Sequence, residues 1–261
     1  MKLKLYQIDA FTDRVFSGNP AGVCPLDAWL PAQTMQAIAA ENNVAETAFF
    51  VKGSPHYGLR WFTPTVEIAL CGHATLASAC VIMTELARDM TRISFETQSG
   101  VLGVARNGDL YTLDFPSYPP QPATPPARLA AALGVTPVDV WQARHYMVLL
   151  KDEAEVRALR PDFSNYDWLN GVDVVVTAEG ADCDFVSRFF APNHGIPEDP
   201  VTGSTHCTLA PYWAKRLGKS RLKARQVSAR GGELLCELAG DRVLIAGRCA
   251  KYLEGEISID D

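Results

Sequence analysis

Residues 196–213 read IPEDPVTGSTHCTLAPYW: two adjacent acids, a proline, a Thr-Gly-Ser turn and a histidine precede an apolar run. A small-residue turn ahead of such a run is typical of the start of a helix. The first N–H groups of a helix have no partner within it, and its N-terminus carries partial positive charge, so such a turn can bind a carboxylate. The stretch therefore predicts either a helix cap at Ser204 and Thr205 or half of an anion-binding site.

A second copy of this pattern lies in the first half of the chain. RWFTP at 60–64 recurs as RFFAP at 188–192, and HATLA at 73–77 recurs as HCTLA at 206–210, in the same order. Repetition at this length predicts two copies of one α/β unit rather than a short-period solenoid. Because both copies open their helix with a small-residue turn, CGHAT and TGSTH, the repeat favours a site over a simple cap.

Each half is predicted to be a mainly antiparallel sheet wrapped around one central helix. Residues 73–88, HATLASACVIMTELAR, are apolar nearly all round, which is expected of a helix inside a domain. Residues 30–43 open with proline and predict a further helix with an apolar face at Met35, Ile38 and Ala39. Strands are predicted for the runs rich in β-branched and aromatic residues. The predicted fold class is α/β (α+β), with two pseudo-symmetric domains.

A proline-rich segment separates the two halves. FPSYPPQPATPP at 115–126 contains six prolines, so it can form neither a helix nor a central strand. We predict an N-terminal domain over 1–114, a linker over 115–126 and a C-terminal domain over 127–249. The last strand, 250–261, is predicted to pair back with the first domain.

Composition limits the partners and the compartment. The 261 residues are 48% hydrophobic and 21% charged, with a net charge of −6 and no long basic stretch, so neither nucleic acid nor an anionic membrane surface is an expected partner. The N-terminus lacks an apolar signal core, which predicts a cytoplasmic protein. The seven cysteines form no Cys-x-x-Cys pair and no zinc-finger spacing. They are interpreted as buried free thiols, and no metal site is predicted.

Several polar side chains are candidates for a site. Asp199 is expected near the second helix start, whereas Glu198 is left as a surface-loop residue. Glu46 lies where a helix gives way to an apolar strand, so it either caps locally or serves as a general acid/base. His73, directly at a helix start, is the better candidate for substrate contact. His206 is expected one turn into its helix, supporting the loop.

Five stretches of the chain resemble the phenazine-biosynthesis F (PhzF-like) isomerase family. They are DAFTDRVFSGNPAGV at 9–23, AENNVAETAFF at 40–50, LCGHATLASA at 70–79, RFFAPNHGIPEDPVTGSTHCTLAPYWAKRLGK at 188–219 and SARGGEL at 228–234. The resemblance covers nearly the whole chain except residues 115–170. It implies a fold similar to diaminopimelate epimerase, with a cleft between two pseudo-symmetric domains.

The resemblance also implies an activity. Members of the family are cofactor-free isomerases of small carboxylated substrates, and the best-known member moves a double bond in trans-2,3-dihydro-3-hydroxyanthranilate. The glutamate of the ETAF motif, here Glu46, inherits the acid/base role. The resemblance further implies catalytic roles for His73, Asp199 and Ser204 and substrate-binding roles for Gly72, Thr202 and Gly203. A homodimer is suggested by the family alone.

Two alternatives stay open. Diaminopimelate epimerase uses two facing cysteines at its two helix starts; here Cys71 stands at one start, but Cys207 lies past the other turn. Cys71 is therefore interpreted as a small buried residue, unless the helix end stabilises its thiolate. An amino-acid epimerase or racemase would use Glu46 and Asp199 in place of the thiols. The other alternative is a non-catalytic protein that binds a small acid.

Overall fold

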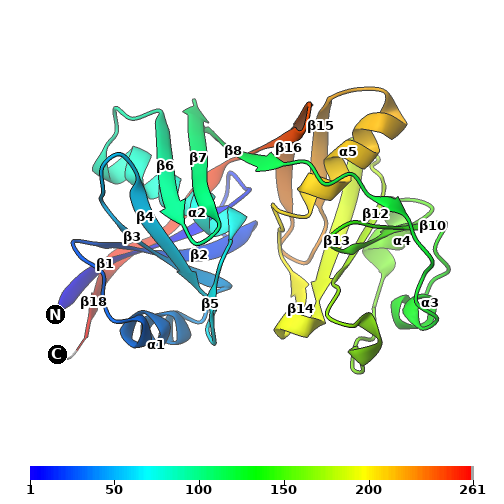
Figure 1. Cartoon of the computed structure of the whole chain (residues 1–261), viewed down its shortest axis with the longest axis horizontal. Coiled ribbons are helices and arrows are strands. Elements are labelled where there is room, and N and C mark those ends of the chain that lie inside the picture. The colour runs from blue at the N-terminus through cyan, green and yellow to red at the C-terminus, as the bar shows by residue number, and fades with distance from the viewer. Residues whose placement is uncertain (260–261) are drawn as a thin grey trace. The chain divides into compact units, whose positions relative to one another are not determined.

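The computed structural model describes residues 1–259 of the chain (Figure 1). The chain forms two compact units, one built from Met1–Asp114 with Ala246–Asp261 and the other from Phe115–Ile245. Within the described residues, no helix has the length and apolar character needed to cross a membrane.

The first unit is a curved sheet around a buried helix. Its strands pair in the order β18-β1-β2-β3-β4-β6-β7-β8, and every pair is antiparallel except β2–β3 and β4–β6; the short β5 pairs with β4. The strands are β1 (Lys2–Ala10), β2 (Asn19–Leu26), β3 (Glu46–Val51), β4 (Tyr57–Phe62), β5 (Glu67–Ile68), β6 (Arg92–Thr97), β7 (Gly100–Asn107), β8 (Leu110–Pro116) and β18 (Cys249–Ser258).

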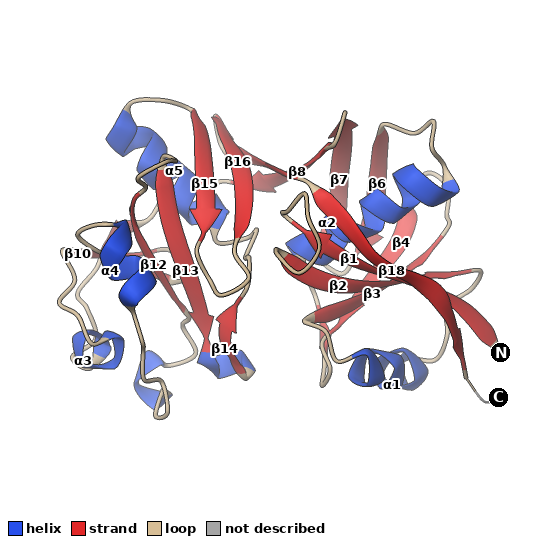
Figure 2. Cartoon of the chain, turned by 180° about the vertical axis from the view of Figure 1, so that it is seen from behind, coloured by secondary structure: helices blue, strands red, loops and turns tan. Residues whose placement is uncertain are grey.

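The central helix of this unit is α2 (Gly72–Val81). All of its residues are buried, and it contacts β1, β2, β3 and β18 (Figures 1 and 2). It continues as the π-helical segment η1 (Ile82–Leu86). Helix α1 (Ala32–Asn42) begins after Pro31 and buries Met35, Ile38 and Ala39 against an apolar cluster that includes residues of β2, β3 and β4. The predicted apolar face of α1 and the all-round burial of α2 are both confirmed.

The second unit repeats this topology. Its strands pair in the order β9-β10-β11-β12-β13-β15-β16, with β11–β12 and β13–β15 parallel, and β14 pairs with β13. The strands are β9 (Gln121–Pro122), β10 (Asp139–Gln142), β11 (Tyr146–Leu149), β12 (Val174–Glu179), β13 (Phe185–Ala191), β14 (Ile196–Asp199), β15 (Arg221–Gln226), β16 (Gly232–Ala239) and β17 (Arg242–Gly247). The helices are α3 (Leu129–Leu133), α4 (Glu153–Ala158), η2 (Asp167–Leu169), η3 (Pro192–His194) and α5 (His206–Leu217).

The sequence repeat corresponds to equivalent elements. RWFTP begins within β4 and RFFAP within β13, and the helices that follow, α2 and α5, hold the HATLA and HCTLA copies. Each unit also has a parallel strand pair before these elements, and a helix lies in the connection between the two strands. Helix α1 lies between β2 and β3 in the first unit, and α4 lies between β11 and β12 in the second. The predicted fold class, a mainly antiparallel sheet around a helix occurring twice, is confirmed.

The proline-rich segment is part of the second unit. Gln121 and Pro122 form β9 and pair with Gln142 and Trp141 at the edge of the sheet. The amide of Tyr118 donates to the carbonyl of Cys207. Proline is compatible with such an edge strand because no ladder hydrogen bond from its nitrogen is needed there. Strand β18 pairs with β1 in the first unit, and residues 260–261 of the predicted last strand lie outside the described residues.

Gly18, which precedes β2, is expected to be intolerant of substitution. Its φ is +66°, and a Cβ there would overlap the carbonyl oxygen of Ala10 and lie 2.7 Å from Cγ2 of Thr12. A left-handed residue other than glycine costs about 1–2 kcal/mol, and the backbone overlap adds to that. We expect Gly18→Ala to lower the free energy of unfolding, measured in urea, by clearly more than about 2 kcal/mol.

The matched control is Gly108→Ala. Gly108 has a φ of +61° but nothing within 4 Å of an added Cβ, so it reports the conformational cost alone, about 1–2 kcal/mol. Equal losses in the two variants would show that the Ala10 contact has no effect on stability.

Candidate active site

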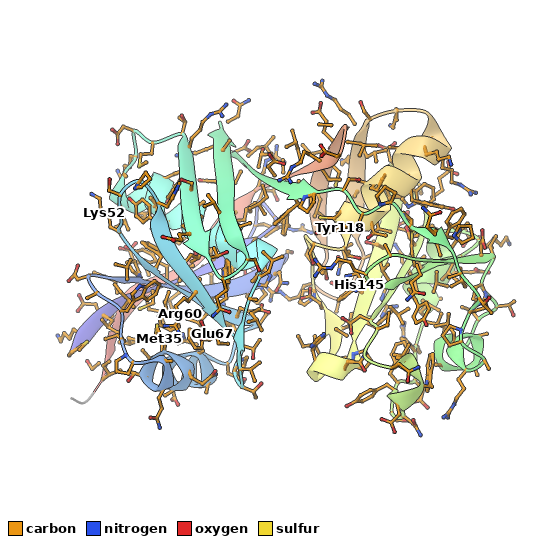
Figure 3. The ribbon with its side chains drawn as sticks, in the orientation of Figure 1. Met35, Lys52, Arg60, Glu67, Tyr118 and His145 are labelled. Atoms are coloured by element: carbon orange, nitrogen blue, oxygen red, sulfur yellow. The ribbon has the colours of Figure 1, made fainter. Side chains whose placement is uncertain are left out.

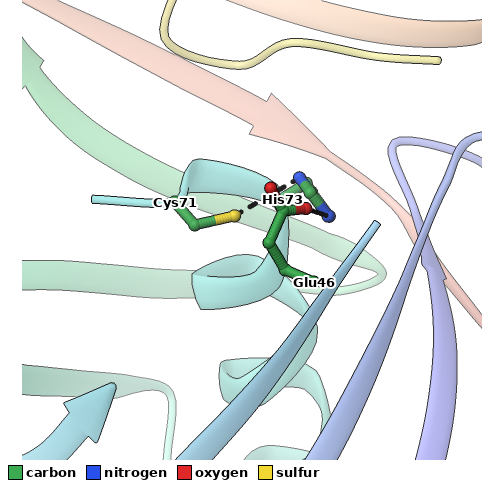
Figure 4. Close-up of side chains that lie close together, drawn as sticks. All are labelled: Glu46, Cys71 and His73. Atoms are coloured by element: carbon green, nitrogen blue, oxygen red, sulfur yellow. Dashed lines mark hydrogen bonds and ion pairs between the residues drawn. The ribbon is translucent and has the colours of Figure 1, made fainter. Parts of the chain in front are cut away.

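Three side chains of the first unit lie close together, although one of them comes from a position distant in the sequence from the other two. Glu46 is the first residue of β3, where the parallel pairing with β2 sets it opposite Ala21. Cys71 lies immediately before α2, and His73 is the second residue of that helix. The exposed fractions are 8% for Glu46, 6% for Cys71 and 5% for His73. Strand β3 and the start of α2 therefore bring together Glu46 and His73, two residues predicted from the sequence, and add Cys71 (Figure 4).

The imidazole of His73 lies between the other two groups. Its Nε2 is 3.1 Å from Oε2 of Glu46, and its Nδ1 is 3.5 Å from Sγ of Cys71 (Figure 4). The first contact is close, but its atoms are poorly aligned: Glu46 Oε2 and His73 Nε2 are both buried without a well-formed hydrogen bond among the described residues. We therefore describe it as an electrostatic contact. A carboxylate oxygen in this state keeps lone pairs for a ligand.

Asn19 is a site residue that the sequence analysis did not single out. It is fully buried at the start of β2, and its Nδ2 lies 3.2 Å from Nδ1 of His73. Because the two ends of an amide can exchange by a flip, Asn19 can donate to a neutral ring or accept from a protonated one. In either state Nε2 of His73 carries a proton and lies 3.1 Å from Oε2 of Glu46. Asn19 lies in SGNPAGV at 17–23, within one of the stretches that resemble the family. That resemblance was the signal in the sequence that could have identified Asn19 as a site residue.

Electrostatics favour a protonated His73. Burial by itself would lower the pKa of His73, but attraction to Cys71 and to Glu46 outweighs burial and raises this pKa well above its usual value. Burial raises the pKa of the Cys71 thiol, and the Glu46 carboxylate raises it further. An uncharged thiol exerts little attraction at neutral pH, so Glu46 is the partner that holds the proton on His73 there.

The same three residues offer one donor atom each within 4.8 Å of one another. Sulfur, nitrogen and oxygen donors of this kind suit zinc. However, Cys71 and Glu46 approach opposite nitrogens of one imidazole, and a single ion can take only one of those nitrogens. The ring would have to turn before all three donors met at one point, so this arrangement suits proton transfer better than metal binding.

The predicted residues of the second unit run from Asp199, the last residue of β14, through the turn that precedes α5. Thr202 donates its hydroxyl to Oδ2 of Asp199, and its amide donates to Oε1 of Gln226 at 2.8 Å. Nε2 of Gln226 donates to the carbonyl of Asp199 at 2.8 Å. Gln226, buried at the end of β15, was not predicted, and it fixes the turn through both ends of its amide.

The start of α5 differs in detail from the prediction. The helix begins at His206, with Thr205 before it, and neither Thr205 nor Ser204 caps it through its side chain. His206 is therefore the first helical residue rather than one turn in. It supports the turn as predicted, because Nδ1 donates to the carbonyl of Thr202 at 2.9 Å. The Ser204 side chain is half-buried.

The buried His206 is expected to make the free energy of unfolding depend on pH. Burial lowers its pKa to about 4 from an ordinary value of 6.5, although the bond to Thr202 opposes this shift. Between these values the unfolded chain binds the proton and the folded chain does not, so stability is complete above pH 6.5 and falls as the pH approaches 4. The loss is on the order of 3 kcal/mol. His145, whose pKa burial also lowers to about 4, adds to the same window.

We expect His206→Asn to reduce this slope, because asparagine can keep the bond to Thr202 and does not titrate. The measurement is the free energy of unfolding at pH 7 and pH 4.5 for both proteins. An unchanged difference between the two pH values would mean that His206 is not buried in its neutral form.

Glu198 is part of a salt bridge. Two hydrogen bonds, at 2.7 and 2.9 Å, join it to Arg188 of β13, which also donates to the carbonyls of Val156 and Leu159. The first repeat has the same pair, Arg60 and Glu67, at 2.7 and 2.8 Å (Figure 3). The interpretation of Glu198 as a surface-loop residue is therefore wrong: its carboxylate tethers β14 to β13.

A cavity of about 490 Å³ in the second unit borders this salt bridge. Its walls include Arg188, Phe190 and Glu198 but none of the predicted site residues. Arg188 and Glu198 in the wall are already paired with each other. The cavity is thus not assigned to the active site.

Comparison with known proteins agrees with this architecture. The family described as "Phenazine biosynthesis-like protein" matches residues 8–255. An uncharacterized isomerase of Pseudomonas aeruginosa is 50% identical over 99% of this chain and 100% of its own length. A phenazine biosynthesis-like domain-containing protein of Rattus norvegicus is 40% identical over 99% of this chain and 100% of its own.

Solved structures give the same result. The crystal structure of a PhzF family protein from Enterococcus faecalis has a TM-score of 0.95 and 45% identity, covering 99% of this chain and 100% of that chain. A hydroxyproline epimerase from Agrobacterium vitis, at 14% identity and a TM-score of 0.62 over 100% of this chain and 93% of that chain, shares the fold. With its relatives described as isomerases, this chain is an isomerase that belongs to the phenazine biosynthesis-like (PhzC-PhzF) family.

Proposed function

We propose that this isomerase moves a proton, and with it a double bond, on a small carboxylated substrate, with Glu46 as the general acid/base and without metal or organic cofactor. The observation that supports this most directly is the buried Glu46 oxygen held 3.1 Å from His73 Nε2 without a well-formed hydrogen bond. Such a carboxylate can take a proton from carbon and return it to a second carbon on the same face. No redox change is required.

His73 assists by its charge. Its raised pKa keeps a positive charge beside Glu46, and that charge stabilises the enolate-like anion that forms when the substrate loses a proton. General acid/base catalysis contributes about 10²–10⁴-fold. Any larger acceleration has to come from positioning and from electrostatic stabilisation of this anion.

The substrate class is proposed from the family resemblance. We propose an acid similar to trans-2,3-dihydro-3-hydroxyanthranilate. Contact between this substrate and the second-unit turn remains a prediction: Thr202 and Gly203 would bind the carboxylate, and Asp199 and Ser204 would contact neighbouring polar groups. The hydrogen bonds among Asp199, Thr202 and Gln226 support the proposal because they hold that turn in one conformation.

Deuterium uptake tests the proposal. The purified protein is incubated in D₂O with a panel of small unsaturated and amino-substituted carboxylic acids, including trans-2,3-dihydro-3-hydroxyanthranilate, and uptake at carbon is followed by NMR. A shifted double bond is the expected result, with deuterium uptake wherever the proton on Glu46 exchanges with solvent before its return. Saturable binding of an acid with neither uptake nor a shifted double bond would instead favour the non-catalytic binding protein.

An epimerase is the second candidate. It is favoured by one observation, the Cys71 thiol at the start of α2 beside His73, since a second proton-carrying group would allow protonation of the opposite face. The stereochemistry of the product separates the two functions. The proposed isomerase yields a new double-bond position, whereas an epimerase inverts the configuration at one carbon and leaves the double bonds in place.

A further inference from the structure

We propose that Cys80 and Cys249 form an oxidisable thiol pair in the first unit. A peroxide oxidises Cys80 to a sulfenic acid, and Cys249 then closes a disulfide bond with it. The pair lies at the opposite end of α2 from His73, and this inference does not depend on the proposed function. It follows from the place of the two thiols in the fold and from the groups that surround Cys80.

The two cysteines come from elements that contact each other, α2 and β18. Sγ of Cys249, the first residue of β18, is 3.9 Å from the carbonyl oxygen of Leu76. That carbonyl points along the helix toward Cys80, which lies one turn later on the same face. The two thiols are hydrogen-bonded to each other. A disulfide would bring their sulfurs to about 2.05 Å and join the end of α2 to the start of β18.

The surroundings of Cys80 favour its thiolate. The hydrogen bond from Cys249 is the largest effect, and although burial opposes it, the pKa of Cys80 falls to about 7 from an ordinary value of 9.0. The Tyr111 hydroxyl and the charge on Arg106 also lower this pKa. Arg106 is held in place, because its Nη1 donates to the carbonyl of Met83 at 2.8 Å and its guanidinium lies 5.6 Å from the centre of the Tyr111 ring. A large share of Cys80 is therefore ionised at pH 7, and the thiolate is the form that peroxide oxidises.

Cys249 is suited to the second step. Burial, the hydrogen bond to Cys80 and the charge on Cys80 raise the pKa of Cys249 well above its ordinary value, so this thiol keeps its proton while Cys80 is the thiolate. A sulfenic acid is neutral, so oxidation removes the charge from Cys80. One of the effects that hold the proton on Cys249 is then gone, and its sulfur can attack the neighbouring sulfenic acid.

Atoms and electrons balance with peroxide as the oxidant. The Cys80 thiolate attacks one oxygen of hydrogen peroxide; a sulfur–oxygen bond forms, the oxygen–oxygen bond breaks, and hydroxide leaves. The sulfur is oxidised and the peroxide is reduced, and the hydroxide takes up the proton that Cys80 had lost to solvent. The sulfur of Cys249 then displaces the hydroxyl group of the sulfenic acid, which leaves with the Cys249 proton as water.

Peroxide treatment of the native protein tests the pair. Reduced protein is treated with hydrogen peroxide at pH 7, its remaining thiols are alkylated in urea, and its peptides are identified by mass spectrometry. We expect a disulfide-linked peptide that contains Cys80 and Cys249 and that a reductant separates. Cys183 is the internal control, because it is more exposed than Cys80, at 6%, while burial raises its pKa. Oxidation of Cys183 ahead of Cys80 would mean that exposure alone decides reactivity, and would overturn the proposal.

The same reaction in urea shows whether the fold creates the selectivity. In unfolded protein the hydrogen bonds to Cys80 are lost, so its pKa returns to the ordinary value and its preference over Cys183 should disappear. A preference for Cys80 that persisted in urea would contradict the assignment, since it could not come from the surroundings of Cys80 in the fold.

Variants separate the two steps. In Cys249→Ser the reaction should stop at the sulfenic acid, which dimedone labels at Cys80, whereas Cys80→Ser should lose both the disulfide and the label. Tyr111→Phe keeps the ring beside Arg106 but removes the hydroxyl. If this raises the pKa of Cys80 by one unit, oxidation at pH 7 slows about fivefold. Cys183→Ser should behave like wild type. Equal dimedone labelling of Cys80 in wild type and in Cys249→Ser would show that Cys249 closes no disulfide.

Discussion

Replacing Glu46 with glutamine is expected to lower turnover and deuterium uptake by about 10²–10⁴-fold. Glutamine keeps the length and shape of the side chain but cannot take a proton from carbon. It also removes the negative charge 3.1 Å from Nε2 of His73, so the positive charge on the imidazole is no longer favoured. The measurement is the rate of double-bond shift or deuterium uptake with the same acid for both proteins.

The matched control is Glu41→Gln. Glu41 is an exposed residue of α1, so this variant makes the same chemical change away from the cluster and should retain wild-type rates. Because Glu46 is at the start of β3, the unfolding transition of Glu46→Gln has to be measured beside its activity. Wild-type turnover by a folded Glu46→Gln protein would rule out Glu46 as the acid/base.

Removing the Glu198 carboxylate is expected to cause a large loss of stability. The side chain of Arg188 is 10% exposed and that of Glu198 is 23% exposed, and Arg188 would keep its charge in this buried setting. Breaking a buried ion pair from one side costs about 3–5 kcal/mol. We expect Glu198→Leu to lower the free energy of unfolding in urea by an amount at the lower end of that range, since Glu198 is not fully buried.

Two further variants make this prediction specific. The double variant Arg188→Met with Glu198→Leu should recover part of the loss, because no unpaired charge stays buried. The exposed pair Lys4–Glu256, at 54% and 48% exposure, gives the contrast: Glu256→Gln should change stability by less than about 1 kcal/mol. If Glu198→Leu kept full stability but lost deuterium uptake, Glu198 would belong to the active site instead.

The fold could be predicted from the sequence because the patterns that indicate it are either local or repeated. The all-round apolar character of residues 73–88 and the proline ahead of α1 report on burial and on helix starts directly. The paired RWFTP and RFFAP motifs identified two equivalent units, since a motif that recurs in the same order occupies the same place in both. The start of α5 was less predictable, because residues 203–205 form a turn with few distinguishing residues before the helix begins.

The candidate site was predicted only in part. Glu46 and His73 were identified by their positions at element boundaries, and the structure brings them together. Asn19, which contacts His73, is 54 positions away from it in the chain. The burial of its amide depends on how β2 pairs with β3 and packs on α2. The bridging position of Cys71 likewise depends on side-chain orientation at the helix start.

The number of repeats, the class of fold, the family resemblance and the acidic residues worth testing can all be read from the amino-acid sequence. The role of each acid depends on the tertiary structure. Glu198 and Asp199 are neighbours on β14, and alternate residues of a strand point to opposite faces. The pairing of β14 with β13 therefore directs Glu198 to Arg188 and leaves Asp199 with Thr202. Strand register depends on contacts between segments, so no local pattern in the sequence contains it.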